Sequence, residues 1–152
     1  MEWMLMPLKR YADFSGRSRR KEFWMFFLLN FLVYAVVFGL AFGTGSMGEA
    51  ISAANPANGL EVYSAMFSGV GLIAALWALA TFIPNIAVGV RRLHDRDMSG
   101  WWYLGFIVLS MIPLVGLLAS IAFLVVMALE GTRGPNRFGA DPKGGADIDT
   151  FR

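Results

Sequence analysis

The sequence predicts an all-α fold, a polytopic membrane helix bundle, and three observations lead to that prediction. Of the 152 residues, 57% are hydrophobic and 16% are charged, and the mean hydropathy is +0.56. Three long stretches, residues 24–43, 62–90 and 101–129, contain no charged residue. The lysines and arginines lie before the first stretch, between the second and third, and after the third, with none in residues 44–61. A soluble domain of this size could not bury so much apolar surface, whereas a bilayer removes the need to do so.

The N-terminal residues 1–23 are basic and partly amphipathic, which predicts a short helix lying on the membrane surface. Pro7 indicates that this helix is interrupted or begins late. A cleaved signal peptide is the alternative, but the polar lead is too long and no small-residue cleavage site follows. We therefore expect an uncleaved anchor. Residues 1–143 are then one integral membrane domain, and residues 144–152 are a disordered tail.

Residues 24–43 form the first predicted span, because twenty apolar residues cross a hydrocarbon core of ~30 Å. Within it, Asn30 and Tyr34 share one helix face and are expected to hydrogen-bond a neighbouring helix. Residues 44–61 are rich in small and polar residues and predict a flexible connector. The stretch 62–90 is longer than a straight span requires, so we expect a helix that is kinked near Pro84.

The third stretch, residues 101–129, is interrupted by Pro113, and two interpretations compete. One tilted, kinked helix would carry the C-terminus to the opposite side of the membrane. Two short helices, about 101–112 and 114–129, would return it to the same side. Length does not decide, but the positive-inside rule does, because the hairpin places all thirteen basic residues in the cytoplasm. We predict the hairpin, with the N-terminus and the C-terminus both cytoplasmic.

The single histidine, His94, lies in a polar segment between the second and third stretches and precedes Asp95. A histidine beside a carboxylate can act as a base, but we expect this pair to tie the loop to neighbouring segments. A zinc site needs three or four ligands, and the chain has one histidine and no cysteine. The alternative metal site is an oxygen-only Mg²⁺ site formed by Asp95, Asp97 and Asp141.

Glu22 lies at the predicted membrane boundary, where an unpaired carboxylate is costly. We therefore expect the polar segments to meet at the cytoplasmic face, with arginines bridging Glu22 and Asp95. One specific prediction is that Glu22 pairs directly with Arg92. A double-mutant cycle on these two residues would test it, because additive effects would count against direct pairing.

Three ordered motifs carry a resemblance to a known family. They are Gly16-Arg17, Arg20 and Glu22-Phe23-Trp24; Arg91-Arg92-Leu93-His94-Asp95 with Ser99-Gly100-Trp101-Trp102; and Gly131-Thr132, Gly134, Asn136-Arg137-Phe138-Gly139 and Asp141-Pro142. With them, nearly the whole chain resembles the small bacterial inner-membrane proteins catalogued as domain of unknown function 805 (DUF805). Arg133 and Ala140 stand where that family commonly has proline. The resemblance implies a multi-pass bacterial membrane protein, and it assigns no activity.

These observations predict a non-enzymatic membrane module that presents a cluster of motif residues at the cytoplasmic face. The cluster, expected to bind anionic lipid headgroups or a protein partner, consists of Arg17, Arg20, Glu22, Arg91, Arg92, His94, Asp95, Asn136, Arg137 and Asp141. Trp24, Trp101 and Trp102 are expected to be interfacial anchors. The alternatives are a small oligomeric transporter or channel subunit, and a membrane enzyme acting on a lipid phosphate. We expect no catalytic residue, metal, cofactor or nucleic-acid partner; a homo-oligomer or a membrane-protein partner is compatible with the pattern.

Overall fold

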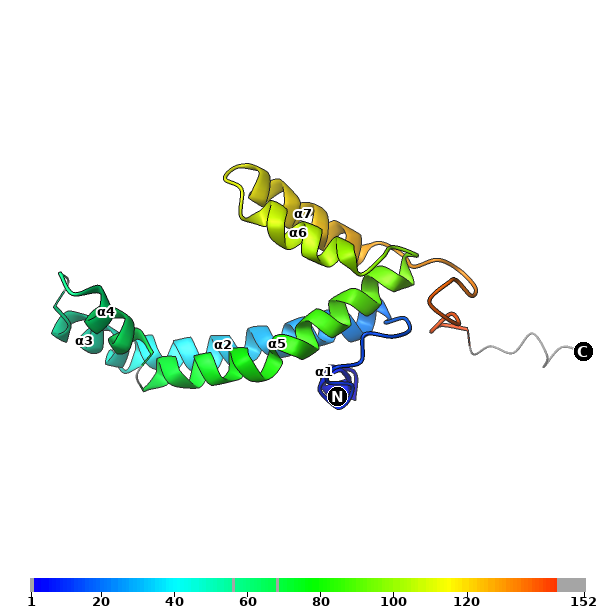
Figure 1. Cartoon of the computed structure of the whole chain (residues 1–152). Helices are drawn as coiled ribbons and strands as arrows, with labels where there is room; N and C mark the ends of the chain where they lie inside the picture. Colours follow the sequence, from blue (N-terminus) through cyan, green and yellow to red (C-terminus); the bar gives the residue numbers. More distant parts are fainter. Residues whose placement is uncertain (1, 56, 68, 145–152) are drawn as a thin grey trace, which may run out of the picture. The chain divides into compact units, whose positions relative to one another are not determined.

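The chain is all-α in the computed structural model, which describes residues 2–55, 57–67 and 69–144. The described residues form seven helices (Figure 1): α1 Glu2–Lys9, α2 Arg20–Gly43, α3 Ser46–Ala53, α4 Gly59–Met66, α5 Val70–Asp95, α6 Trp101–Ser110 and α7 Val115–Ala128. Helices α2 and α5, with 24 and 26 residues, are long and apolar enough to cross a membrane. These helices confirm the predicted fold class.

The chain divides into two compact units, and each is described by itself. Unit 1 consists of residues 1–26 and 83–152, and unit 2 consists of residues 27–82. Every lysine and arginine of the sequence belongs to unit 1, and unit 2 has none. Apart from Gly144, the predicted disordered tail lies outside the described residues.

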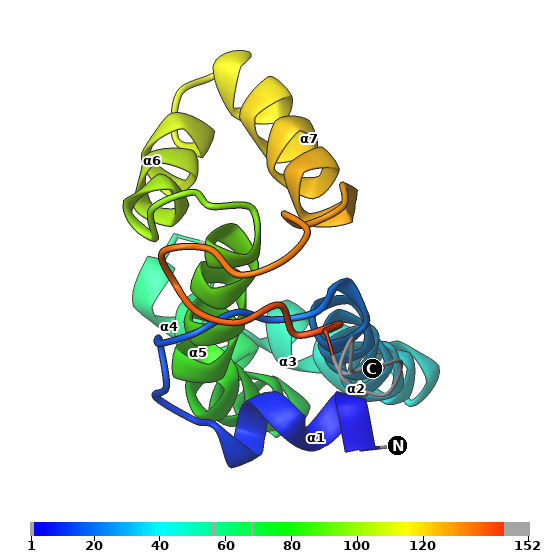
Figure 2. The same ribbon diagram turned by 90° about the vertical axis from the view of Figure 1, so that its right-hand side faces the viewer.

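Helices α6 and α7 form the predicted hairpin, and they lie side by side in Figures 1 and 2. At about 1.5 Å per residue, the ten residues of α6 reach only ~15 Å, too short to cross the membrane. Leu114 reverses the chain with a positive φ of 67°. A Cβ on Gly116 would lie 2.3 Å from the Ser110 carbonyl oxygen, so the close return depends on glycine there.

Aromatic side chains fix the hairpin within unit 1. The ring of Phe123 on α7 lies edge-on to Phe23, Tyr103 and Phe106, with centroids 6.3, 5.6 and 5.4 Å away. Tyr103 also approaches α5 closely, since a Cβ on Gly89 would lie 2.4 Å from its Cε2 atom. The start of α2, the end of α5 and the hairpin therefore share one aromatic core.

Two local expectations differ from the structure. Helix α1 runs through Pro7 without interruption, whereas α5 contains Pro84 and runs as far as Asp95, so the expected kink there stays a prediction. The expected flexible connector contains α3 and the start of α4, and the Asn58 side chain caps α4 by accepting a hydrogen bond from the Leu60 N–H. The second apolar stretch is consequently shared between α4 and α5, with Gly69 in a positive-φ conformation between them.

Candidate functional site: a buried cluster of ion pairs

Two carboxylates and three arginines form a buried cluster in unit 1. Arg17, Glu22, Arg91, Arg92 and Asp95 are each at most 6% exposed. Asp95 Oδ1 accepts from Arg17, with its Nε at 3.0 Å, and Asp95 Oδ2 accepts from Arg92. Glu22 Oε1 accepts from Arg91 Nη2 at 2.8 Å. Each buried charge thus has an opposite charge beside it, which is the condition for burying it at all.

The partner of Glu22 differs from the predicted one, because Arg91 and not Arg92 pairs with it. Neighbouring residues on a helix point about 100° apart, so Arg91 and Arg92 cannot serve the same partner. Arg92 instead shares a face with Asp95, three residues later on α5, and pairs with that carboxylate. The expected pairing of Glu22 with Arg92 is therefore wrong.

The remaining arginine donors hold backbone carbonyls of distant segments. Arg17 donates to the carbonyls of Thr132 and Gly134 at 2.5 and 2.6 Å. Arg92 donates to Met127, at 3.0 Å, and to Leu129, both at the end of α7. The last carbonyls of a helix lack partners within it, so Arg92 caps α7 from α5. Arg91 likewise donates to the Asp13 carbonyl ahead of α2.

The closing segment, residues 130–142, packs directly on Asp95. The Thr132 N–H donates to the Asp95 carbonyl at 2.8 Å. A Cβ on Gly131 would lie 1.9 Å from Asp95 Oδ2, so only glycine fits at this position. Asp141 organises the turn that follows, accepting from the backbone N–H groups of Lys143 and Gly134 at 2.9 and 3.0 Å. These hydrogen bonds, first the one from Lys143, lower the pKa of Asp141.

The His94 ring contacts two other motif segments and not its neighbour Asp95. Its Nδ1 atom lies 3.2 Å from the Gly16 carbonyl oxygen, and its ring stacks on Phe138 with centroids 3.9 Å apart. Asn136 adds a hydrogen bond of 2.9 Å from its side-chain amide to the His94 carbonyl. Both Asp95 oxygens are occupied by arginines, so His94 and Asp95 do not form an acid–base pair.

The other predicted cluster residues lie at the surface of unit 1. Arg20 pairs with Glu130 at 2.7 Å, and Arg137 pairs with Asp97 at 3.1 Å, all with partly exposed side chains. Of the predicted anchors, Trp101 and Trp102 are exposed, and Trp24 is half-buried. The structure thus brings all ten predicted residues into unit 1, but only five of them into the buried cluster.

Some contacts of the site use backbone groups, which the residue type does not reveal. Fully buried Ser18 donates its backbone N–H to the Arg91 carbonyl at 3.1 Å, and Thr132 and Asp13 supply carbonyls to arginines. These contacts are made by backbone N–H and carbonyl groups, so the type of side chain does not show that the residue belongs to the site. Gly131 was quoted as part of a motif, and the close contact with Asp95 now gives its physical reason.

The Mg²⁺ alternative is contradicted by the geometry. Within residues 2–55, 57–67 and 69–144, no three histidine, aspartate or glutamate side chains are close enough to share a metal ion. Asp95 is engaged by two arginines, Asp97 pairs with Arg137, and Asp141 accepts from backbone N–H groups.

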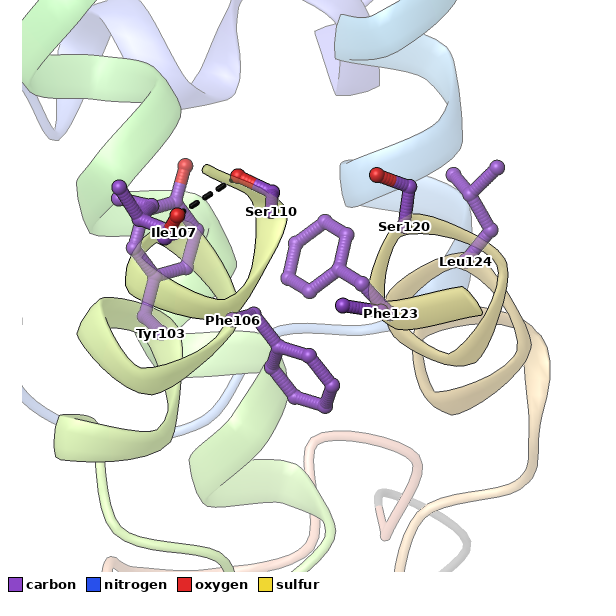
Figure 3. A pocket seen from close by; sticks show the side chains of 8 residues that line it. Tyr103, Phe106, Ile107, Ser110, Ser120, Phe123 and Leu124 are labelled. Carbon is purple, nitrogen blue, oxygen red and sulfur yellow. Dashed lines mark hydrogen bonds between the residues drawn. The ribbon is translucent and has the colours of Figure 1, made fainter. Parts of the chain in front are cut away.

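An apolar pocket of about 250 Å³ lies between α6 and α7 (Figure 3). Its two serines have their hydroxyls engaged within their own helices. Ser110 donates to the Ile107 carbonyl at 2.7 Å, and Ser120 donates to the Gly116 carbonyl at 2.8 Å. Aromatic rings, including those of Phe106 and Phe123, form much of the remaining wall. The mostly apolar wall suits a hydrocarbon chain.

Comparison with known proteins places these motifs in a family. The family described as "Protein of unknown function (DUF805)" matches residues 11–140. The chain belongs to this family. The DUF805 match includes all five buried cluster residues. "Inner membrane protein YhaI" of Escherichia coli (strain K12) is 41% identical, covering 97% of this chain and 100% of that protein. "Inner membrane protein YhaH" of the same strain is 38% identical, covering 94% and 98%.

Both names support an inner-membrane location for this DUF805 protein. A third relative, "Uncharacterized protein YiiR" of the same strain, is 31% identical over 85% of each chain. No solved structure matches the chain.

Proposed function

We propose that the chain is a non-enzymatic inner-membrane module whose cytoplasmic surface, formed by unit 1, binds anionic lipid headgroups. The observation that carries this proposal is the division of the basic residues. Three arginines are buried and used internally, and the other basic side chains described in unit 1 are partly or fully exposed. The buried set therefore builds the scaffold, and the surrounding set supplies the positive surface.

The surface residues have the chemistry that anionic headgroups require. Lys9, Lys21, Arg133 and Lys143 are exposed. Each lysine or arginine near an anionic leaflet contributes about 1 kcal/mol to membrane attraction. The buried arginines cannot contribute in this way, because carboxylates and carbonyls occupy their guanidinium groups.

The non-enzymatic part of the proposal rests on the lack of a carboxylate that could work together with His94. Both oxygens of Asp95 accept from arginines, and the His94 Nδ1 atom faces a carbonyl. Neither arrangement activates a nucleophile or water for attack on a lipid phosphate.

The proposed topology places both termini in the cytoplasm. Hydrogen bonds from Arg17 to Thr132 and Gly134 support it, because they join the segment before α2 to the segment after α7. The positive-inside rule then assigns the basic side to the cytoplasm. A reporter that is active only in the cytoplasm is expected to be active when it is fused after Lys143. If a reporter that is active only in the periplasm were active after Lys143 but inactive before Met1, the two termini would lie on opposite sides, and the shared cytoplasmic surface would be ruled out.

The lipid proposal is tested by purifying the full chain in mild detergent and measuring bound phosphatidylglycerol by mass spectrometry. Substituting Lys21, Arg133 and Lys143 with glutamine is expected to lower its enrichment over phosphatidylethanolamine by at least tenfold. Each of the three side chains contributes about 1 kcal/mol to membrane attraction, and the loss of all three would account for an even larger decrease in enrichment. The control exchanges lysine and arginine at the same three positions, keeps the charge, and is expected to retain the lipid. Equal enrichment in the glutamine variant would contradict the proposal.

A further inference from the structure

A second pocket in unit 1 is distinct from the ion-pair cluster and from the basic surface. Its volume is about 590 Å³, within the usual range for small-molecule sites. Val90 and His94 of α5, Trp101, Tyr103 and Leu104 of α6, and Phe14 from the N-terminal segment contribute to its wall. Among the described residues that line it, none is lysine, arginine, aspartate or glutamate.

His94 gives this apolar pocket a hydrogen-bond acceptor. The Gly16 carbonyl can only accept, so the His94 Nδ1 atom carries the proton in that hydrogen bond. In the neutral ring the Nε2 atom is then an acceptor, and no residue in the described part of the chain donates to it. His94 and Gly100 both line the pocket, so the hydroxyl of a ligand held there can donate to this acceptor.

Gly100 keeps the space beside that acceptor open. A Cβ at Gly100 would lie 3.4 Å from His94 Nε2 and 2.8 Å from Val90 Cγ1. The backbone of Gly100 is helical, with φ −58° and ψ −22°, so the conformation itself does not require glycine. A side chain at this position would therefore press on Val90 and narrow the space beside His94 Nε2.

The pocket is reached past exposed apolar side chains. Trp101 is 78% exposed and Leu104 is 50% exposed. In a membrane protein such residues face lipid or the headgroup boundary, where tryptophan is enriched. A ligand of this pocket would therefore enter from the bilayer.

We propose that this pocket binds an uncharged lipid alcohol from the surrounding bilayer, with its hydroxyl donating to His94 Nε2 and its hydrocarbon chain lying along α6. A charged headgroup would meet no counter-charge in the pocket wall, and burying it unpaired is costly. A plain hydrocarbon chain would leave the Nε2 atom without a donor. The hydroxyl is the group that satisfies both conditions. This site is independent of the anionic-lipid surface proposed above.

The proposal is tested with the full chain in phosphatidylcholine nanodiscs and a long-chain alcohol that carries a photoreactive diazirine. Saturable labelling of the peptides containing Val90 and Leu104 is the expected result. The same probe with a phosphate ester in place of the hydroxyl is expected to label them at least tenfold less. Equal labelling by the phosphate ester, or labelling that does not saturate, would overturn the proposal.

Two variants separate ligand binding from a structural role of His94. In His94→Asn the amide can still donate to the Gly16 carbonyl, but the acceptor at the Nε2 position is lost. It is expected to weaken alcohol binding about three- to tenfold, the loss of one hydrogen bond. Phe138→Leu removes the ring stack and keeps the acceptor, and it is expected to bind as the unaltered chain does.

If His94→Asn fails to fold, Gly100→Ala decides, because it keeps the imidazole and places a Cβ in the space beside its Nε2 atom. It is expected to weaken saturable labelling in protein that still folds, with a somewhat lower unfolding temperature because the new Cβ meets Val90 Cγ1 at 2.8 Å. Undiminished labelling in Gly100→Ala, or in a folded His94→Asn, would overturn the proposal.

Discussion

Polar contacts in unit 1 join distant parts of the chain, whereas those in unit 2 are mostly local. Arg91 and Glu22 are 69 positions apart, and Arg17 reaches a carbonyl 117 positions away. In unit 2 the side chain of Glu61 accepts only from residues at most six positions away. The long-range polar contact described there is the hydrogen bond of 3.1 Å from Trp77 Nε1 to Asn30 Oδ1.

The difference shows which part of the molecule depends on individual residues. Lipid tails are as apolar as leucine, so hydrophobicity does not specify which membrane helices meet. The ion pairs and carbonyl contacts of unit 1 do specify it, because a partner left alone would be a buried charge. Substitutions in the buried cluster should therefore cost several times more stability than those in unit 2.

The largest effect is expected for Asp95→Ala. It removes the carboxylate that neutralises both Arg17 and Arg92, leaving buried charges unpaired. We expect a loss of about 3–5 kcal/mol in the free energy of unfolding, measured by denaturant titration in detergent. Asp97→Asn is the control, because it breaks an exposed ion pair, suits the positive φ of this residue and should cost at most about 1 kcal/mol. Similar losses in the two variants would mean that the cluster is not the stabilising centre of unit 1.

A double-mutant cycle on Glu22 and Arg91 measures the second pair directly. Glu22→Gln and Arg91→Gln are expected to show a coupling energy of about 1–3 kcal/mol, as residues in contact do. The same cycle on Glu22 and Arg92 should give a smaller value, since Arg92 pairs with Asp95. A larger coupling with Arg92 would restore the pairing that the sequence suggested.

Gly131→Ala tests the packing of the closing segment. The new Cβ would meet Asp95 Oδ2 at 1.9 Å, so the carboxylate or the segment must move. Overpacking of this kind typically costs about 1–3 kcal/mol in unfolding free energy, measured as above. The control is Gly105→Ala in α6, where a Cβ meets nothing within 4 Å. An unchanged unfolding free energy in Gly131→Ala would show that the closing segment does not pack against Asp95 in solution.

Hydrophobic runs and charge were sufficient to predict the helical fold and the hairpin. The break at Pro113 lies between α6 and α7, and helix α2 includes the predicted residues 24–43. The predicted boundaries ended where charge began, yet α2 starts at Arg20 and α5 continues to Asp95. Charged residues extend these helices because their side chains find partners in other segments, which an uncharged-run criterion cannot detect.

The site was predictable as a set of residues but not as a set of contacts. Motif positions identified Arg17, Glu22 and Asp95, and a carboxylate at the membrane boundary implied an arginine partner. Which of two adjacent arginines serves Glu22 depends on the rotation of α5, which the sequence does not reveal. The carbonyl partners of Arg17 and Arg92 were also hidden, because any residue type can supply a carbonyl.

In unit 2, Trp77→Phe breaks the long-range hydrogen bond to Asn30 and keeps an aromatic ring in place. Hydrogen bonds between membrane helices average about 0.6 kcal/mol, so a small loss in unfolding free energy is expected. Tyr63→Phe serves as the control in the same unit, because that side chain is exposed and should be neutral. A loss comparable to that of Asp95→Ala would contradict the distinction between the units.

The smallest effect concerns Asp141, at the edge of unit 1, and it depends on pH. Backbone hydrogen bonds from Lys143 and Gly134 lower the pKa of this carboxyl below its ordinary value of 3.8. A lowered folded-state pKa means that the carboxylate stabilises the turn above about pH 3.8, and this stabilisation is lost as pH falls through the folded value. Hydrogen exchange at the Gly134 amide should therefore accelerate, relative to its intrinsic rate, only at more acidic pH. In Asp141→Asn this pH step should disappear, and its persistence would assign the titration to another group.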